Sequence, residues 1–511
     1  MEKKRWFAST LTKRLVVSIL IIIQLLFIIF VAIRGIRYSA LINVVLKAIS
    51  LLVAFNILWT PTKNEYKMTW IFLILLFPVF GGLFYLLIKT QSLRKKLNIR
   101  YKNIEKNTMH CYSMTGEYSE KAYELCPENT HLIKYLESEL GFPVYGRTGT
   151  RYLSPGEQMF RYLKRELLKA EKYIFLEYFI IEEGVMWNSI LDILEEKAKS
   201  GVDVRVMYDD MGCILKLPKE YSKELKKRGI KCVVFNPFKP VLEAMQNNRD
   251  HRKIAVIDGK VAFTGGINLA DEYINEIEKF GHWKDSSVMV TGDGAWGLTV
   301  MFLQMWTFAT GTEEDYKSFF PQKRETVYGD GFVQPYADSP IDNENVGENV
   351  YLHIINSAKK YLYINTPYLV IDDTMLTALK LAAKSGVDVK IITPGMWDKA
   401  VVRFTSRSYY HELIEAGVQI FEYQKGFMHS KIFVSDDILA TVGTTNLDYR
   451  SLYLHFECGI CMYRTSAVEQ IKYDFLETLS KCKKIKPEDC SGTTPLSRLM
   501  GQVFRLFAPL L

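Results

Sequence analysis

Two short motifs with the same residue types and the same spacing lie 178 residues apart in this 511-residue sequence. The stretches HRKIAVID and MHSKIFVSD share the order H-x-K-x4-D, and an asparagine follows each histidine after 17 residues. A single histidine and lysine on a strand are usually surface residues, but repetition at one spacing argues against that interpretation. The candidate residues are His251, Lys253, Asp258 and Asn268 in the first copy and His429, Lys431, Asp436 and Asn446 in the second.

These residue types are suited to chemistry on a phosphodiester. A neutral imidazole can attack phosphorus, and a second, protonated imidazole can give a proton to the departing alkoxide. Two lysines and two asparagines can then hold the non-bridging oxygens. The pattern predicts phosphoryl transfer through a phosphohistidine, without a metal or a cofactor, completed by water or by another alcohol.

The elements around the motifs are duplicated as well. AKSGVDVRVMYD at Ala198–Asp209 matches AKSGVDVKIITP at Ala383–Pro394, and AEKYIFLEYF at Ala170–Phe179 matches AKKYLYINTPYL at Ala358–Leu369. Each half reads as helix, strand, helix, strand, helix, strand, strand, which is a mixed α/β unit. Side-chain alternation would place each histidine and its lysine on one strand face, and each aspartate at the following turn. We expect the two halves to pack face to face around one shared active site.

The domain boundaries follow from the repeat and from the composition. We predict a membrane-anchor region over residues 1–106, a connecting segment over 107–150, and two α/β domains over 151–334 and 335–511. The polar stretch Pro335–Asn349 is the predicted connection between the two domains.

The N-terminal region is apolar and basic. The uncharged stretches Leu15–Ile33 and Met68–Ile88 are long enough to cross a membrane as helices, and Leu41–Trp59 is a weaker candidate. Residues 1–106 contain 17 lysines and arginines and three acids, whereas the whole chain is only +8, so the remainder sums to −6. This balance favours anionic membrane lipids as partners and argues against a nucleic-acid substrate. Basic clusters at both ends of the region favour a multi-pass protein of the cell membrane with a cytoplasm-facing catalytic part, although three spans would leave one cluster outside.

Several other residues are given structural interpretations. Cys458 and Cys461 form a CxxC inside an apolar strand pattern, and Asp209-Asp210 has no acidic partner set, so neither pair is expected to bind metal. Histidines without a lysine partner, among them His455, are expected to pack in the core or lie on the surface. The C-terminal stretch Ser497–Leu511 is an amphipathic helix that either lies on a membrane or caps a domain.

The paired motifs resemble the phospholipase D superfamily, and the wider pattern is similar to its bacterial cardiolipin synthases. The further resemblance lies in FPVFGGLFYLLI (Phe77–Ile88), VGTTNLDYRSLYLHFE (Val442–Glu457) and the C-terminal FAPLL. It covers the chain from about residue 40 to the end.

The resemblance implies a role for each matched residue. The first-half histidine, His251, would be the nucleophile and His429 the general acid, while the lysines and asparagines would bind phosphate. Glu457 would orient a histidine through its second ring nitrogen. The first half departs from the pattern, because an insertion leaves Asp285 as the nearest candidate counterpart, and Gly266 stands where serine is more common.

The implied reaction joins two phosphatidylglycerol molecules into cardiolipin and glycerol. Three alternatives stay open at this point: hydrolysis of phospholipid headgroups, a membrane-tethered nuclease, and an inactive scaffold that binds anionic lipids. The sequence leaves the preferred acceptor alcohol and the oligomeric state open.

Overall fold

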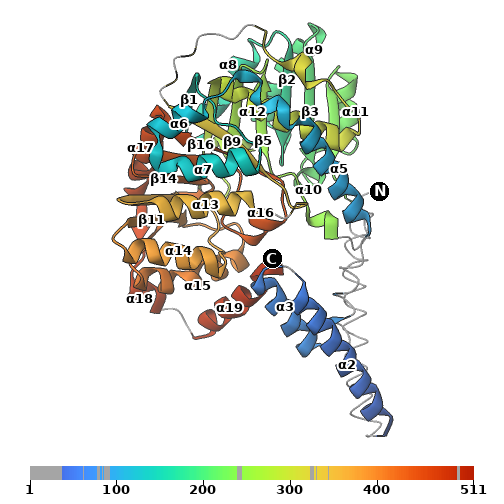
Figure 1. Cartoon of the computed structure of the whole chain (residues 1–511), viewed down its shortest axis with the longest axis vertical. Coiled ribbons are helices and arrows are strands. Elements are labelled where there is room, and N and C mark those ends of the chain that lie inside the picture. The colour runs from blue at the N-terminus through green and yellow to red at the C-terminus, as the bar shows by residue number, and fades with distance from the viewer. Residues whose placement is uncertain are drawn as a thin grey trace. The chain divides into compact units, whose positions relative to one another are not determined.

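The computed structural model describes residues 37–60, 62–77, 81, 82, 85, 92–238, 244–322, 327, 329, 331–342, 344–491 and 495–510. It divides into two compact units (Figure 1). The larger, catalytic unit contains Leu97–Pro237 and Asn248–Gln502. The smaller, N-terminal unit contains residues up to Lys96 together with Phe238–Asn247 and Val503–Leu511.

The N-terminal unit is built on two apolar helices, α2 (Arg37–Trp59) and α3 (Asn64–Leu76). Ile57, Trp70 and Ile74 are buried in a small core between them. The predicted span Met68–Ile88 is not one uninterrupted helix, because α3 ends at Leu76 and Phe77 leaves the helical conformation. Among the residues described, no helix combines the length and the apolar character needed to cross a membrane. The predicted span Leu15–Ile33 lies outside the described residues.

The first half of the catalytic unit follows the expected alternation of helices and strands. Its elements are β1 (Thr148–Leu153), α8 (Gly156–Leu167), β2 (Tyr173–Tyr178), α9 (Val185–Lys199), β3 (Asp203–Asp209), α10 (Asp210–Cys213), α11 (Tyr221–Lys227), β4 (Lys231–Phe235), β5 (Lys253–Ile257), β6 (Val261–Gly265), β7 (His282–Lys284), β8 (Ser287–Gly292) and α12 (Asp293–Thr310).

The second half repeats this order. Its elements are β9 (Phe332–Asp338), α13 (Val346–Ser357), β10 (Tyr361–Asn365), α14 (Asp373–Lys384), β11 (Asp388–Pro394), α15 (Ala400–Glu415), β12 (Gln419–Tyr423), β13 (Gly426–Met428), β14 (Ile432–Ser435), β15 (Leu439–Gly443), α16 (Tyr449–Tyr453), β16 (Glu457–Tyr463), α17 (Ser466–Leu479) and β17 (Cys482–Lys484). These elements are followed by α18 (Pro487–Ser491), α19 (Pro495–Phe507) and a short 3-10 helix at Ala508–Leu510.

Each half forms one mixed sheet. The first has the order β1-β8-β6-β5-β2-β3-β4 and the second the order β17-β12-β11-β10-β14-β15-β16-β9. In both, three parallel strands joined by helices continue into antiparallel strands, because β2 pairs with β5 and β10 pairs with β14 in antiparallel fashion. The predicted duplicated α/β fold with mixed sheets is therefore confirmed.

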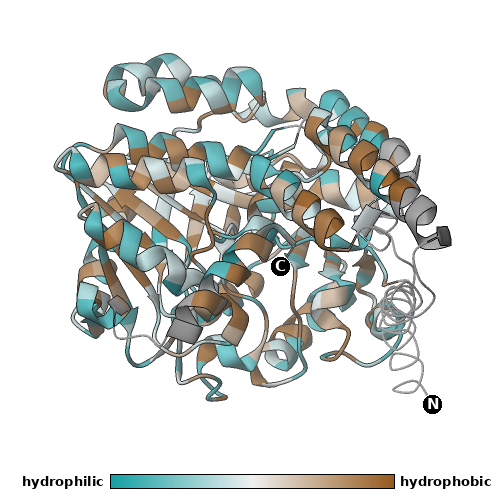
Figure 2. Cartoon of the chain, turned by 90° about the horizontal axis from the view of Figure 1, so that it is seen from below, coloured by the Kyte–Doolittle hydropathy of each residue, from teal (hydrophilic) through white to brown (hydrophobic). Residues whose placement is uncertain are grey.

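Apolar residues of both sheets meet in a common core. Phe175 and Ile254 of the first sheet belong to the same buried cluster as Leu362 and Ile391 of the second, and α12 is buried along almost its whole length within it. Figure 2 shows hydrophobic strands next to helices that alternate hydrophobic and hydrophilic residues, as expected for helices with one face on a sheet. Burial of this shared core holds the two halves together.

The segment before the first domain is part of the catalytic unit. From Leu97 onward it contains most of α5 (Ser92–Thr108), followed by α6 (Ser119–Leu125) and α7 (Thr130–Lys134). Its residues Cys111, Leu132 and Leu136 are buried in the shared core. The stretch predicted as the connection between domains, Pro335–Asn349, is not a free linker, because it contains most of strand β9 and the start of α13. Because this stretch is rich in residues typical of loops, its sequence does not indicate the strand, which pairs with β16.

Candidate active site

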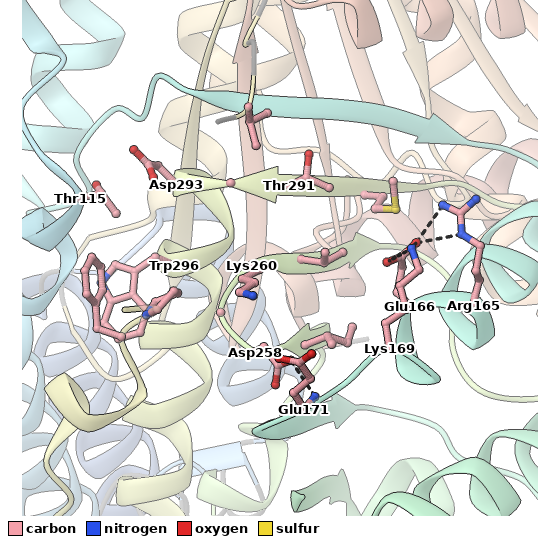
Figure 3. A pocket seen from close by; sticks show the side chains of 18 residues that line it. Thr115, Arg165, Glu166, Lys169, Glu171, Asp258, Lys260, Thr291, Asp293 and Trp296 are labelled. Carbon is pink, nitrogen blue, oxygen red and sulfur yellow. Dashed lines mark hydrogen bonds and ion pairs between the residues drawn. The ribbon is translucent and has the colours of Figure 1, made fainter. Parts of the chain in front are cut away.

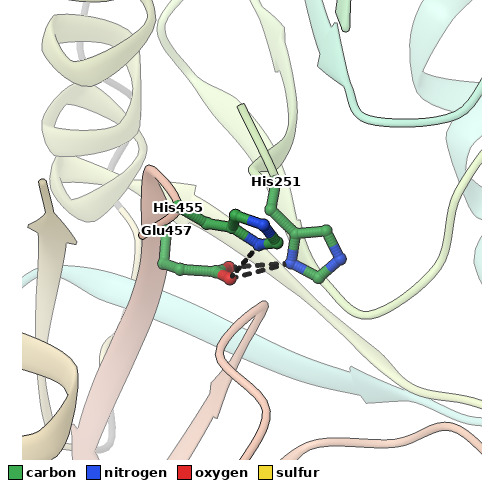
Figure 4. Close-up of side chains that lie close together, drawn as sticks. All are labelled: His251, His455 and Glu457. Carbon is green, nitrogen blue, oxygen red and sulfur yellow. Dashed lines mark hydrogen bonds and ion pairs between the residues drawn. The ribbon is translucent and has the colours of Figure 1, made fainter. Parts of the chain in front are cut away.

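His251 is positioned by a backbone contact with the other half of the chain. Its backbone N–H donates to the carbonyl of Phe456 at 2.9 Å, and the N–H of Phe456 donates to the carbonyl of Arg249 at 2.8 Å. This bridge places Glu457, the next residue, beside the imidazole. The Nδ1 atom of His251 lies 2.9 and 3.0 Å from the two Glu457 carboxylate oxygens (Figure 4).

His429 is positioned by the same arrangement with the halves exchanged. Strand β7 of the first half pairs in parallel with β13 of the second, and the N–H of His429 donates to the carbonyl of Lys284 at 2.8 Å. The residue after Lys284 is Asp285, and its Oδ2 atom lies 2.6 Å from His429 Nδ1. Asp285 and Glu457 therefore occupy equivalent places, each one residue beyond the carbonyl that binds the opposite histidine.

The protonation of the first pair suits a nucleophile. Burial lowers the pKa of His251 to about 3, although Glu457 opposes the shift, so the imidazole is neutral at pH 7. Burial alone would raise the pKa of Glu457, but the neighbouring His251 holds it well below its usual range. The imidazole donates its one proton from Nδ1 to the carboxylate, and Nε2 carries a free electron pair.

The second pair holds its proton differently. Burial raises the pKa of Asp285 to about 7, against the lowering effect of Lys431, Lys253 and His251. Burial, together with Lys431 and Lys253, lowers the pKa of His429 well below its usual value. The carboxyl group of Asp285 can therefore keep a proton next to His429 near neutral pH.

Each motif lysine contacts the backbone carbonyl of the histidine two residues before it. Lys253 Nζ donates to the His251 carbonyl at 2.5 Å, and Lys431 Nζ donates to the His429 carbonyl and lies 2.9 Å from His429 Nδ1. Burial lowers the pKa of Lys253 to about 7 and that of Lys431 to about 8. Bound phosphate would favour the charged ammonium groups.

The strands begin later than predicted. Strand β14 starts at Ile432, so His429 and Lys431 lie in the extended segment before it, and β5 starts at Lys253, after His251. The backbone N–H groups of His251 and His429 donate to carbonyls of the opposite half, so they are not available for hydrogen bonds between neighbouring strands of their own sheet.

The two asparagines differ in their surroundings. The side chain of Asn268 accepts from the Ile180 N–H at 3.0 Å and donates to the Tyr273 hydroxyl at 2.7 Å. In the described residues, the buried Oδ1 atom of Asn446 has no hydrogen-bond partner. A phosphate oxygen accepts hydrogen bonds, so only the Nδ2 donor of an asparagine can bind it, and in Asn268 this donor is already bound to Tyr273.

The motif aspartates lie at hairpin turns. Asp258 and Asp436 adopt left-handed φ values of 52° and 56°. Each carboxylate accepts three consecutive backbone N–H groups, which for Asp258 are those of Glu171, Lys172 and Tyr173 and for Asp436 those of Lys359, Lys360 and Tyr361. These aspartates fix the start of strands β2 and β10 and do not contact the histidines.

A physical reason accounts for glycine at position 266. A Cβ atom there would lie 2.2 Å from Asp285 Oδ1, so a larger residue would displace that carboxylate. In the second half Thr444 occupies the equivalent place, and its hydroxyl donates to Glu457. The two halves therefore differ in this hydroxyl contact.

His455 is the site residue that the sequence interpretation missed. Its ring centroid lies 5.4 Å from that of His251, and its Nδ1 atom lies 3.7 Å from Glu457 Oε1 (Figure 4). The available signal was its position two residues before Glu457, because residues i and i+2 of an extended segment share a face.

The other polar candidates have structural partners. Asp209 forms a buried ion pair with Arg249 at 2.8 Å and caps α10. Cys458 and Cys461 lie on β16 as free, buried thiols.

A pocket of about 510 Å³ lies at the far end of β5 from His251 (Figure 3). Its lining includes Asp258, Lys260, Lys169, Glu166 and Trp296, and neither motif histidine is among the lining residues. It is therefore separate from the site of the paired histidines.

Comparison with known proteins was made on sequence and on structure. The family model described as "Cardiolipin synthase, PLD-like domain" matches residues 163–280 and 351–479, and the model "Phospholipase_D-nuclease N-terminal" matches residues 48–89. A cardiolipin synthase of Alkalihalophilus pseudofirmus is 38% identical over 88% of this chain and 89% of the relative. An uncharacterised protein of Streptococcus mutans is 47% identical over 87% of this chain and 96% of the relative.

Among solved structures, the phosphatidylserine synthase of Haemophilus influenzae matches with a TM-score of 0.55 and 14% identity, covering 71% of this chain and 93% of that chain. At this identity the match shows a common fold.

Proposed function

Because this chain belongs to the cardiolipin synthase family of phospholipase-D-like proteins, we propose that it transfers a phosphatidyl group from one phosphatidylglycerol molecule to another. The products are cardiolipin and glycerol. One phosphodiester replaces another, so the reaction needs no nucleotide as an energy source. The enzyme is a phosphatidyltransferase that acts on phospholipids.

In the first step, His251 Nε2 attacks the phosphorus of the donor lipid. A P–N bond forms, the P–O bond to the headgroup glycerol breaks, and protonated His429 gives its proton to the departing alkoxide. The bound phosphodiester anion raises the pKa of His429, so the proton held by Asp285 in the free site moves to the imidazole. Lys253, Lys431 and Asn446 stabilise the charge on the non-bridging oxygens.

In the second step, His429 is neutral and acts as a base. It takes the proton from the terminal hydroxyl of a second phosphatidylglycerol, whose oxygen attacks phosphorus while the P–N bond breaks. His251 returns to its neutral form, with Nδ1–H donated to Glu457. Water at the same position would give phosphatidic acid, which is the hydrolytic alternative.

One observation carries this proposal. Each motif histidine contacts a carboxylate of the opposite half, His251 with Glu457 and His429 with Asp285. The two pairs therefore belong to one site. They hold a proton in different places, on the His251 imidazole in the first pair and on the Asp285 carboxyl group in the second, which suits a nucleophile and a general acid.

We further propose that the N-terminal unit holds the enzyme in the cell membrane as a multi-pass anchor, with the catalytic unit facing the cytoplasm. The support is the basic residues that flank the apolar stretches and the match of residues 48–89 to the N-terminal family model. Confinement to a surface raises the effective concentration of two lipid substrates. Protease protection in right-side-out and inverted vesicles tests the orientation, and cleavage of the catalytic unit in right-side-out vesicles would contradict it.

The test of function uses the full chain in detergent micelles that contain only phosphatidylglycerol and EDTA. Products of the wild type and of His251→Ala are identified by mass spectrometry. We expect equal amounts of cardiolipin and glycerol from the wild type and neither from the variant.

The other outcomes separate the alternatives. Phosphatidic acid in place of cardiolipin would make the protein a phospholipase. No turnover of phosphatidylglycerol by the wild type would refute the proposed reaction and favour a lipid-binding scaffold or a nuclease.

A further inference from the structure

A third histidine adjoins the nucleophile and has no role in the mechanism above. His455 lies in the segment between α16 and β16, and 11% of its side-chain surface is exposed. Among the described residues its buried Nδ1 atom makes no hydrogen bond. It faces Glu457, the carboxylate that also binds His251 (Figure 4).

The three side chains have the spacing of metal ligands. One ligand atom from each of His251, His455 and Glu457 can be chosen so that all lie within 4.8 Å of one another. Glu457 Oε1 lies 2.9 Å from His251 Nδ1 and 3.7 Å from His455 Nδ1. Around a tetrahedral zinc ion with bonds of about 2.0–2.1 Å, neighbouring ligand atoms are about 3.3 Å apart. The two distances from Glu457 lie on either side of that value, and no two of the three ligand atoms are more than 4.8 Å apart.

The ligand types also fit zinc. Two imidazole nitrogens and one carboxylate, with a fourth position left for water, form a common set at zinc sites of enzymes. Carboxylate and imidazole ligands together favour zinc over magnesium and calcium, which prefer oxygen ligands alone.

The charges around the cluster are of both signs. Lys253 and Lys431 are basic, and Glu457 supplies a carboxylate that lies beside both His251 and His455. The His251 and His455 side chains are 9% and 11% exposed, so the cluster can be reached from solvent.

We propose that Zn²⁺ binds His251 Nδ1, His455 Nδ1 and Glu457, and that it reversibly inhibits the enzyme. The inhibition rests on the proposed function, whereas the binding does not.

The inhibition follows from the two nitrogens of His251. In the free site the proton is on Nδ1 and the electron pair of Nε2 is available for attack. Zinc on Nδ1 uses that nitrogen's electron pair, so the Nδ1 proton leaves to solvent and a proton from solvent occupies Nε2. The nucleophilic electron pair is lost until the metal dissociates.

Binding is measured first, without lipid. The full chain in detergent, freed of metal with a chelator that is then removed, is titrated with Zn²⁺ by calorimetry and with Co²⁺ by visible absorption. We expect one equivalent to bind with a tetrahedral Co²⁺ spectrum, and His455→Asn to weaken this binding at least tenfold.

A matched control comes from the surface. His411 pairs with Glu415 at 3.5 Å on α15 and is exposed, so it is another histidine next to a carboxylate that is not part of the cluster of His251, His455 and Glu457. His411→Asn should leave affinity and spectrum unchanged. Equal affinity in the wild type and His455→Asn, or the absence of a one-equivalent site in the wild type, would overturn the proposal.

The second measurement is the initial rate with phosphatidylglycerol at buffered free Zn²⁺. We expect at least tenfold inhibition of the wild type at the concentrations that saturate binding, full reversal by EDTA, and a tenfold higher half-inhibitory concentration for His455→Asn. Saturated protein that retains its full rate would overturn the inhibitory role. A protein that makes no cardiolipin even with EDTA would refute the proposed function, while the titration would still decide the zinc site.

Discussion

The Nδ1 atoms of His251 and His429 each face a carboxylate that the other half of the chain supplies. The pairs are His251 with Glu457 and His429 with Asp285. The ionised Glu457 fixes the tautomer of His251, because it accepts a hydrogen bond from Nδ1 and cannot donate one, whereas Asp285 can hold a proton beside His429. The reactivity of each imidazole therefore depends on a residue that is distant in the sequence.

Replacing Glu457 with glutamine keeps the size of the side chain nearly constant and should slow the reaction strongly. The amide can donate to Nδ1, which favours the tautomer with its proton on Nε2, the atom that must attack. By analogy with histidine–carboxylate pairs in hydrolases, we expect kcat to fall by about 10²–10⁴-fold. The measurement is the initial rate of cardiolipin formation from phosphatidylglycerol.

Asp285→Asn is the corresponding change at the other histidine and should also lower kcat. Circular dichroism and thermal unfolding show whether either variant is misfolded. A folded Glu457→Gln enzyme within fivefold of the wild-type rate would contradict the role of this carboxylate.

At the scale of residues, the sequence predicted the site residues that recur at the same spacing in both halves. The histidines, lysines and asparagines occur at one spacing in both halves, so they could be found without a structure. Asp285 could be named only as a candidate, because the insertion in the first half hides its equivalence to Glu457. His455 was missed because the first half has no histidine at the matching position, so it does not belong to the repeated pattern. Its place in the site depends on its contact with Glu457, which also binds His251.

At the scale of elements, the hairpin aspartates connect the motif strands to their neighbours. Asp258 lies between β5 and β6, and its carboxylate binds the three backbone N–H groups that lead into β2. Because β5 is the strand that follows His251, this contact also fixes the strand next to that histidine.

Asp258→Ala should therefore destabilise the fold. The substitution leaves three backbone N–H groups without their acceptor, and water can replace only some of the lost hydrogen bonds. We therefore expect the free energy of unfolding to fall by about 2 kcal/mol. Thermal or urea unfolding measures the change. Asp192→Ala, which removes an exposed carboxylate on α9, is the control and should stay within about 0.5 kcal/mol of the wild type. Equal stability of the two variants would contradict the role of the turn.

The order of the elements was predictable and their pairing was not. Two copies of the same pattern made the helix and strand assignments consistent, since each copy supports the other. Strand β9 was read as a linker because Pro335, Asp338 and Ser339 are typical of loops, and only its pairing with β16 makes it a strand. Strands β7 and β13 have three residues each and pair across the halves, a contact that local periodicity cannot indicate.

At the scale of the whole molecule, the site exists only when both halves are present in one chain. Strand β7 pairs with β13, Asp250 bridges to Phe456, and both sheets share a core. All of these contacts are within the chain, so the two motifs need no second subunit to meet.

A mixture of two inactive variants should therefore remain inactive. Equal amounts of His251→Ala and His429→Ala contain no chain with both histidines, and we expect less than about 1% of the wild-type rate after mixing, or after unfolding and refolding together. The measurement is again cardiolipin formation. Recovery towards one quarter of the wild-type rate after joint refolding would mean that halves exchange between chains.

The part of helix α5 that belongs to the catalytic unit contacts both halves and brings a titratable group into the interior. Its Tyr101 hydroxyl accepts from Arg252 at 3.3 Å, and its ring packs on Phe456 at 5.5 Å. One turn later, burial and the nearby Asp342 raise the pKa of Glu105 to about 7.

The raised pKa of Glu105 predicts how the stability of the whole enzyme depends on pH. The folded state binds the Glu105 proton more tightly than the unfolded chain does. The protonated side chain therefore contributes fully to the free energy of unfolding below about pH 4.5, and this contribution is lost as the pH rises through 7. The shift corresponds to about 2 kcal/mol after allowance for partial exposure. Glu105→Gln keeps an uncharged side chain at every pH, so the fall in thermal midpoint from pH 5.5 to pH 8 should be smaller for the variant by a few degrees. An identical fall in both proteins would show that Glu105 is ionised in the folded state throughout this range.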